Sequence, residues 1–338
     1  NQQLENLHGL TSLAEVTGDL HINNAFLRTT DGLDALTTIG GDAEIGGYLG
    51  CEALEDVDGL QNLASVGGEL EIDGCPVLTD LSALNGLTDL GSLELRELPS
   101  LTAIPQFDHL TSVDGRFYLY QLPEITEITG FNLLDSPDVY ITLRDADALE
   151  RITGFNALTV ADSVSIHSNG SLEEVSGFSV LSEVGGIQIS DTVATEITGF
   201  SSVQILTSHL VVRNNDSLTA LPAFQLQAFT TLSDEVDISA NNALNDITAL
   251  GNLETIGDGV GPDYLRLTYN ASLTHLGGLE QLRAVNYAGI EMDENELLSD
   301  VTALHGLEYV YALDIGRHPA LSAQAIADLE AAIDQIGN

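Results

Sequence analysis

The chain repeats a short hydrophobic triplet, apolar-x-apolar, thirteen times at a nearly constant step. A fixed period of roughly 20–50 residues predicts a solenoid, because each repeat buries its apolar face only by stacking on the next. The alternation within each triplet predicts a short strand whose first and third side chains enter the core. The triplets begin at Leu20, Ala43, Leu70, Leu93, Phe117, Val139, Val164, Ile187, Leu210, Val236, Leu265, Ile290 and Leu313.

We therefore predict a mainly β fold, a right-handed β-solenoid of about 13 coils over residues 1–321, with a capping helix over residues 322–338. Ser322 is the expected N-cap of this helix, and Gly337 is expected to end it. The helix can cover the open core of the last coil with one apolar face, formed by Ile326, Leu329, Ile333 and Ile336.

The charge of the chain limits its partners. Acidic residues outnumber arginine and lysine 52 to 9, the formal net charge is −43, and all nine basic residues are arginine. Such a charge argues against nucleic acid and anionic lipid, because phosphate is attracted by positive surface. Strong acidity without lysine fits marine or halophilic surroundings, where salt screens repulsion. No apolar run is long enough to span a bilayer, so we expect no direct insertion into a membrane.

The better repeats read L-x-x-V-x-G-L-x-x-L-x-x-V-G-G-x-L-x-I-x-x-N, as in residues 54–72, LEDVDGLQNLASVGGELEI. The glycine pairs in this pattern, expected to take positive φ at a tight corner, include Gly40-Gly41, Gly67-Gly68 and Gly185-Gly186. The pattern resembles the leucine-rich-repeat superfamily, with its closest likeness in the receptor L-domain of growth-factor receptors, fungal cell-wall proteins and bacterial surface proteins. That resemblance implies ligand binding or adhesion by a secreted or cell-surface protein, with further domains outside this segment.

An asparagine recurs three residues before a leucine, at Asn24, Asn169, Asn215, Asn241 and Asn270. In leucine-rich repeats the side chain at this position turns inward and bonds the backbone, which predicts a ladder of buried amides. Asn169, Asn215 and Asn270 also begin N-glycosylation sequons, so carbohydrate attachment is the alternative.

Cys51 and Cys75 are the only cysteines, and they occupy the same position of successive repeats. Stacked coils lie about 4.8 Å apart, within the Cα separation that a disulfide tolerates. We therefore expect the pair to be buried on adjacent coils, either as a disulfide or as two free thiols. Two cysteines without a CxxC motif or a nearby histidine do not make a zinc site.

The outward side chains of the strands form the candidate binding face. Arginine and tyrosine dominate binding hot spots, and both concentrate on this row beyond the first coils. Tyrosine is also a good strand former, and arginine relieves repulsion among acids, so a purely structural role is the alternative. The candidate ligand-binding residues are Arg96, Arg116, Tyr118, Tyr120, Tyr140, Arg144, His167, Arg213, Tyr264 and Arg266.

The first coils carry acids on the same row. Carboxylates on adjacent coils repel at about 5 Å, so either hydration and salt tolerate them or a hard cation bridges them. Calcium takes six to eight oxygen ligands. The candidate calcium ligands, in a chain with no other expected cofactor, are Asp42, Glu44, Glu69, Glu71 and Asp73.

These observations favour a non-catalytic extracellular module that binds a protein or glycan ligand along its strand face. The sequence contains no GxSxG, HExxH or P-loop motif, and the glycine-rich stretch 257–261 lacks the strand-turn-helix setting of a phosphate site. Two alternatives remain. One is a β-helical polysaccharide-active enzyme, which would need a compact cluster of carboxylates in a groove. The other is a structural surface spacer without a ligand.

Overall fold

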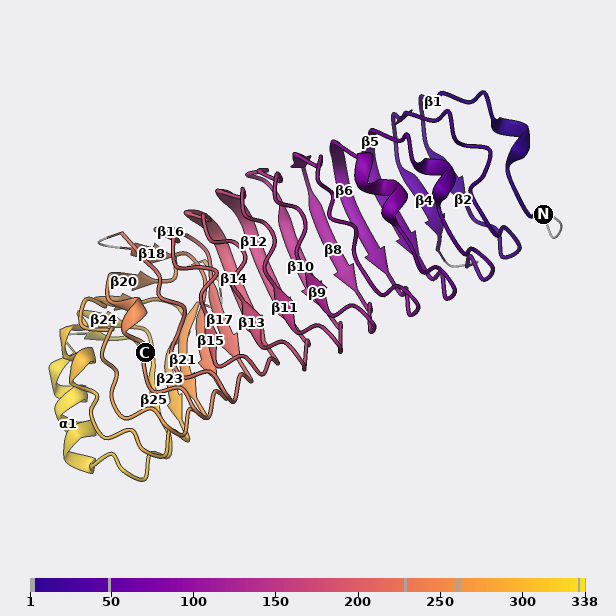
Figure 1. Ribbon diagram of the computed structural model, residues 1–338. Helices are drawn as coiled ribbons and strands as arrows, with labels where there is room; N and C mark the ends of the chain where they lie inside the picture. Colours follow the sequence, from indigo (N-terminus) through magenta and orange to yellow (C-terminus); the bar gives the residue numbers. More distant parts are fainter. Residues whose placement is uncertain are drawn as a thin grey trace. The chain divides into compact units, whose positions relative to one another are not determined.

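The computed structural model describes residues 4–47, 50–227, 230–258, 260–261, 263–333 and 335–337. They form two compact units: unit 1 runs to Leu172 and includes Ser176–Val180, and unit 2 comprises Glu173–Val175 and the chain from Leu181 onward. Both units are built from short parallel strands stacked coil upon coil, as Figure 1 shows within each unit. The predicted β-solenoid of about 13 turns is confirmed.

The triplets of unit 1 form its long sheet, in which successive strands pair in parallel. The register places triplet on triplet, as where Leu93 pairs with Phe117. The predicted triplet at Val139 is the exception: Phe117 pairs with Ile141, so the paired triplet of that coil begins two residues later than predicted. These strands are β2 (Leu20–Ile22), β4 (Ala43–Gly46), β5 (Ser65–Asp73), β6 (Asp89–Arg96), β8 (Arg116–Tyr120), β10 (Tyr140–Arg144) and β12 (Val160–His167). The shorter elements are η1 (His8–Leu10), β1 (Glu15–Val16), β3 (Thr38–Ile39), η2 (Asp58–Leu60), η3 (Ser82–Gly86), β7 (Ser112–Val113), β9 (Glu127–Ile128) and β11 (Arg151–Ile152).

Unit 2 repeats this arrangement with β14 (Glu183–Ser190), β17 (Leu210–Arg213), β19 (Val236–Ser239), β21 (Tyr264–Thr268), β23 (Gly289–Asp293) and β25 (Leu313–Ile315). A second parallel sheet runs through β18 (Thr230–Leu232), β20 (Leu253–Ile256), β22 (Ala284–Val285), β24 (Tyr309–Val310) and β26 (Gln335–Ile336). The remaining elements are β13 (Glu174–Val175), β15 (Glu196–Ile197), β16 (Ile205–Leu206), η4 (Thr248–Leu250), η5 (Thr302–Gly306) and α1 (Ala323–Ala332).

The C-terminal helix is shorter than predicted. Ser322 caps α1 as expected, since its hydroxyl accepts the backbone N–H of Ala325 at 3.1 Å. The helix ends at Ala332, however, and Ile333 is already extended. Ile336 does not lie on the helix: it belongs to β26, which pairs in parallel with β24. Without β26, the edge of β24 would leave backbone N–H and C=O groups unpaired. A strand pairs these groups and a helix does not, which favours a strand at Gln335–Ile336 over a longer helix.

The paired glycines are needed for close approach between coils, and the prediction of positive φ at them was wrong. A Cβ at Gly40 would overlap the carbonyl oxygen of Thr17, and one at Gly67 would overlap that of Gly40. The left-handed conformation occurs instead just after the strands, mostly at residues other than glycine. These corner residues are Gly74, Glu97, Gln121, Asp145, Ser168, Asp191, Asn214, Ala240, Tyr269 and Glu294.

The asparagine ladder is confirmed at four of its five predicted positions. In unit 2 the Oδ1 atoms of Asn241 and Asn270 accept the backbone N–H of the ladder residue one coil earlier, at 3.1 Å. Each amide Nδ2 also donates to a backbone carbonyl, as from Asn241 to Val212 at 2.9 Å. The fully buried members, of which the last was not predicted, are Asn169, Asn215, Asn241, Asn270 and Asn295. Asn24 is only half-buried.

The core of unit 1 contains a column of phenylalanines that was not predicted from the sequence. Phe107, Phe131, Phe155 and Phe178 are all fully buried, and their rings stack with centroids 4.9, 5.2 and 4.8 Å apart. All four have positive φ, between 48° and 62°. Left-handed backbone is unfavourable for such residues, so the stacked core must hold them there.

Cys51 and Cys75 form a disulfide between adjacent coils of unit 1, with their Cα atoms 4.9 Å apart. Both side chains are buried, at 2 % and 0 % exposure, as predicted. The disulfide resolves the alternative that the spacing left open between a bond and two free thiols.

Candidate functional site

The outward side chains of β8 and β10 form a patch in unit 1, made of Arg116, Tyr118, Tyr120, Tyr140 and Arg144. The alternation along both strands is strict, with Phe117, Leu119, Ile141 and Leu143 buried beneath. Parallel register places Arg116 beside Tyr140 and Tyr120 beside Arg144. The sequence placed all five side chains on one face, and the structure brings them together there.

The rings and guanidinium groups of the patch lie against one another. The rings of Tyr118 and Tyr120 stack at 5.7 Å. The Cζ atom of Arg144 lies 4.8 Å from the ring centroid of Tyr120, and that of Arg116 lies 6.0 Å from Tyr118. Tyr140 is the most open of the tyrosines of the patch, with half of its surface exposed. The patch therefore presents the open ring of Tyr140 beside the partly buried rings of Tyr118 and Tyr120, which cation–π contacts hold in place.

Acidic neighbours already pair the arginines of this face. Arg116 contacts the carboxylate of Glu94, which is only 3 % exposed. Arg96 reaches the same carboxylate at 3.5 Å and also pairs with Glu71 and Asp73. These ion pairs stabilise the fold, because removing one arginine would leave the buried carboxylate of Glu94 less well compensated. The arginines thus serve the fold as well as the surface, which partly supports their structural interpretation.

The remaining predicted residues of unit 1 lie at the edges of the patch. His167 follows Arg144 in register on β12, and Arg96 precedes Tyr120 on β6. Arg213, Tyr264 and Arg266 belong to unit 2, where they surround a carboxylate of their own.

That carboxylate, Asp237 on β19, was missed because only the first coils were expected to carry acids on this row. Asp237 is fully buried and accepts Arg213 at 2.6 Å, Arg266 at 3.0 Å and the hydroxyl of Ser239 at 2.6 Å. The ring of Tyr264 lies 4.5 Å from the Cζ atom of Arg266. Two arginines on one buried acid form a tight structural cluster, so we do not count these residues among the exposed binding surface.

The candidate calcium ligands lie on adjacent coils but have protein partners. Glu44 contacts His21 at 2.7 Å, Glu71 and Asp73 pair with Arg96, and Asp42 accepts the backbone N–H of Glu69 at 2.9 Å. In the part of the chain that the structure describes, no three histidine, cysteine or acidic side chains gather closely enough to hold a metal ion. Calcium binding stays a prediction.

Glu69 is the most perturbed acid of this row. Burial, followed by a hydrogen bond and charge repulsion from Glu94, raises the pKa of Glu69 from 4.5 to about 7. Repulsion from Asp42 adds to this rise in pKa, and Arg116 opposes it. Below about pH 7 the carboxyl group of Glu69 therefore holds a proton, and it makes a hydrogen bond with Glu94.

The proton on Glu69 predicts a pH dependence of stability. Between about pH 4.5 and 7 the folded chain holds a proton on Glu69 that the unfolded chain releases, so the free energy of unfolding falls as pH rises through this range. We expect Glu69→Gln, which keeps a hydrogen-bond donor without charge, to be about 1 kcal/mol more stable than wild type at pH 8, because solvent screens part of the repulsion. At pH 4, below the pKa of Glu69 in the unfolded chain, the two proteins should be equally stable.

Urea unfolding at several pH values measures this difference directly. The matched control is Glu71→Gln, on the same strand, which should lower stability at pH 8 because its carboxylate pairs with Arg96. Parallel curves of stability against pH for wild type and Glu69→Gln would show that Glu69 holds no extra proton.

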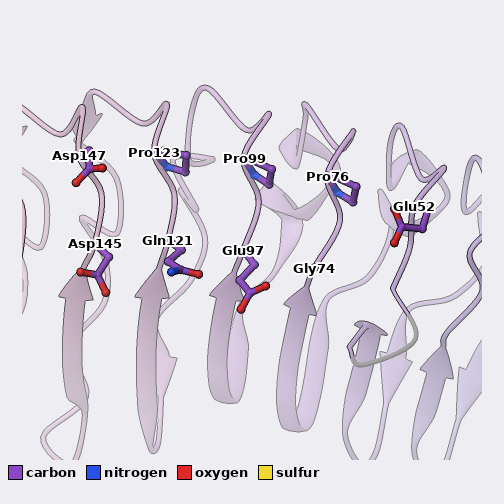
Figure 2. A pocket seen from close by; sticks show the side chains of 9 residues that line it. All are labelled: Glu52, Gly74, Pro76, Glu97, Pro99, Gln121, Pro123, Asp145 and Asp147. Atoms are coloured by element: carbon purple, nitrogen blue, oxygen red, sulfur yellow. The ribbon is translucent and has the colours of Figure 1, made fainter.

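A groove lies beside the patch, where the strands of unit 1 end. It has a volume of about 740 Å³ and two rows of lining residues (Figure 2). One row consists of the corner residues Gly74, Glu97, Gln121 and Asp145; the other consists of Glu52, Pro76, Pro99, Pro123 and Asp147. This groove was not predicted, although the regular recurrence of proline in successive repeats was a visible signal.

Comparison with known proteins does not assign the chain to a family. No protein-family model matches it, and no curated sequence matches it. The likeness to leucine-rich repeats therefore rests on the repeat pattern and stays a prediction. Within the described residues, no helix is both long and apolar enough to cross a bilayer.

Proposed function

We propose that the chain is a non-catalytic extracellular recognition module that binds its ligand on the patch formed by β8 and β10. The observation that carries this proposal is the outward-facing group of three tyrosines on two paired strands. Two of them, Tyr118 and Tyr120, stack on each other and make cation–π contacts with arginine. Tyrosine offers a large contact area with little loss of side-chain freedom, and its hydroxyl group adds a hydrogen bond. The buried row beneath makes the patch rigid, which lowers the entropic penalty of binding.

A glycan fits this patch better than an acidic peptide. Arg116 and Arg144 are paired with Glu94 and Asp145, so the patch offers little uncompensated positive charge. An open ring and several hydroxyl groups suit a neutral, polyhydroxylated ligand, which needs apolar contact and hydrogen bonds together. Protein ligands that present the same groups are the alternative.

The disulfide supports a secreted or cell-surface location, because such bonds persist where the environment is oxidising. The ladder of buried asparagines supports kinship with the leucine-rich-repeat superfamily, in which this position bonds the backbone. The net charge of −43 supports an acidic, salt-tolerant surface. None of these observations favours an enzyme over a binding module.

The variant that tests the patch is Tyr118→Ala, Tyr120→Ala and Tyr140→Ala combined. Arg116 is left in place, because its loss would weaken the pairing of the buried Glu94. Binding to a glycan array and to proteins from a marine or saline extract should fall at least tenfold, equivalent to about 1.4 kcal/mol. Circular dichroism should stay unchanged, since all three side chains point away from the core.

The matched control replaces three exposed tyrosines of unit 2 by alanine: Tyr269, Tyr287 and Tyr311. This control should bind like wild type. If the patch variant captures the same ligands with wild-type affinity, the tyrosines of the patch serve the strands structurally and do not bind a ligand. Cleavage of a captured oligosaccharide would point to the enzyme alternative, and the absence of any ligand to the structural spacer.

A further inference from the structure

The groove at the ends of the unit 1 strands has a chemistry distinct from that of the patch. Its upper row carries Pro76, Pro99 and Pro123 on three successive coils, between Glu52 at one end and Asp147 at the other (Figure 2). Proline rings are apolar and present no backbone N–H. The surface that these proline rings form is therefore suited to the methylene groups of a ligand rather than to its hydrogen-bonding groups.

The charge of the groove is negative along its whole length. Four of its nine lining residues are acids, and none is basic. Asp145 pairs with Arg144 at 2.9 Å. Among the described residues, no arginine or histidine forms an ion pair with Glu52, Glu97 or Asp147, so those three carboxylates are open to an incoming cation. A ligand that complements the groove carries positive heads on aliphatic stems, as lysine and arginine do.

The spacing of the coils selects the conformation of such a ligand. Adjacent coils are 4.9 Å apart where Cys51 meets Cys75, so Glu97 and Asp145, two coils apart, are separated by about 10 Å along the groove. In a polyproline II helix every third side chain points the same way, at intervals of about 9.3 Å. A β-strand repeats its side chains on one face at intervals of about 6.6 Å, which does not match.

We propose that this groove binds an extended peptide in the polyproline II conformation that carries a lysine or arginine at every third position. The basic heads meet Glu97 and Asp145 in one row and Glu52 and Asp147 at the two ends. The stems lie across the proline rings. The row from Glu52 to Asp147 covers four coil steps, about 20 Å, which corresponds to about six residues of such a peptide.

The test compares two synthetic peptides of identical composition, labelled for fluorescence anisotropy. One has the sequence KPPKPPKPP, with lysines evenly spaced, and the other has KKKPPPPPP, with lysines clustered. Titrations at about 0.15 M salt limit the unspecific attraction that a chain of charge −43 exerts on any cation. The evenly spaced peptide should bind at least tenfold more tightly. Equal affinities would overturn the proposal, because attraction would then depend on charge alone.

The variant Glu97→Gln with Asp147→Asn removes two carboxylates from the groove and should weaken binding of the evenly spaced peptide at least tenfold. Gln121 already occupies the corner equivalent to Glu97 at a φ of 52°, so the change is compatible with the backbone. The control, Asp108→Asn with Asp114→Asn, removes the same charge from exposed positions of unit 1 outside the groove. It should change the affinity less than twofold, and equal losses in both variants would contradict the proposal.

The tyrosine variant of the patch separates this site from the proposed function. It should bind the evenly spaced peptide as wild type does, since none of its three positions lines the groove. Loss of peptide binding in that variant would place the peptide on the strand face and overturn the assignment to the groove.

Discussion

Asn241→Ala is expected to lower the free energy of unfolding by about 3–5 kcal/mol, because several buried polar groups lose their partners at once. The Oδ1 atom of Asn241 accepts the backbone N–H of Asn215 at 3.1 Å. Its Nδ2 atom donates to the carbonyl oxygens of Val212 and Ser239, at 2.9 and 3.1 Å. Alanine makes none of these bonds, and water cannot replace them at a position with no exposed surface.

The next residue supplies the control for this prediction. Asn242 is exposed and makes a single side-chain hydrogen bond, to Asp216 at 2.6 Å. Asn242→Ala should therefore change stability by no more than about 0.5 kcal/mol. Urea unfolding followed by circular dichroism compares the two variants. If Asn241→Ala is as stable as Asn242→Ala, the ladder does not stabilise the fold.

Phe131→Ala is expected to have a comparable effect, about 3–5 kcal/mol, through the loss of packing. Phe131 stacks between Phe107 and Phe155 and meets Phe117 edge to face at 4.7 Å. Its removal opens a cavity in the middle of the column, which neighbours held by backbone pairing on both sides cannot fill. The loss of aromatic contacts adds to the transfer term.

Phe26→Ala is the control, because the same atoms are removed from a ring that is 48 % exposed. We expect a loss of less than about 1 kcal/mol for this variant. Phe131→Leu should fall between the two, since it keeps part of the volume. Thermal unfolding of the three variants gives this order. Equal losses for Phe131→Ala and Phe26→Ala would show that the column contributes no more than an isolated surface ring.

The fold was predictable because the sequence repeats a local rule. An apolar triplet at a fixed step places residues such as Leu93 and Phe117 in register, and the stacking of coils follows from burial alone. The glycine pairs show the limit of that rule. A glycine is needed both where φ is positive and where another backbone approaches closely. The sequence alone does not distinguish these two causes at Gly40 or Gly67.

The site was predictable only in part, for the same reason. Alternation places Tyr118 and Tyr140 on the outward face, whatever their neighbours do. Which acid pairs with Arg116 depends on side-chain geometry between coils, and Asp237 shows that a buried acid can occupy the outward row. The groove depends on the corners after the strands, where residues such as Glu97 have a positive φ. The hydrophobic alternation that predicts the strands does not predict the direction of the backbone at these corners.

The ladder has a consequence for how the chain is made. Asn169, Asn215 and Asn270 are sequon asparagines whose amides have no surface in the folded protein. An oligosaccharyltransferase can reach them only before the coils close, and a sugar attached then would keep that coil from ever closing. In a host with such an enzyme, folding and modification would compete during translocation, and the yield of native protein would report which is faster. Substituting the serine of each sequon by alanine would abolish glycosylation at these sites and would leave the buried asparagines in place.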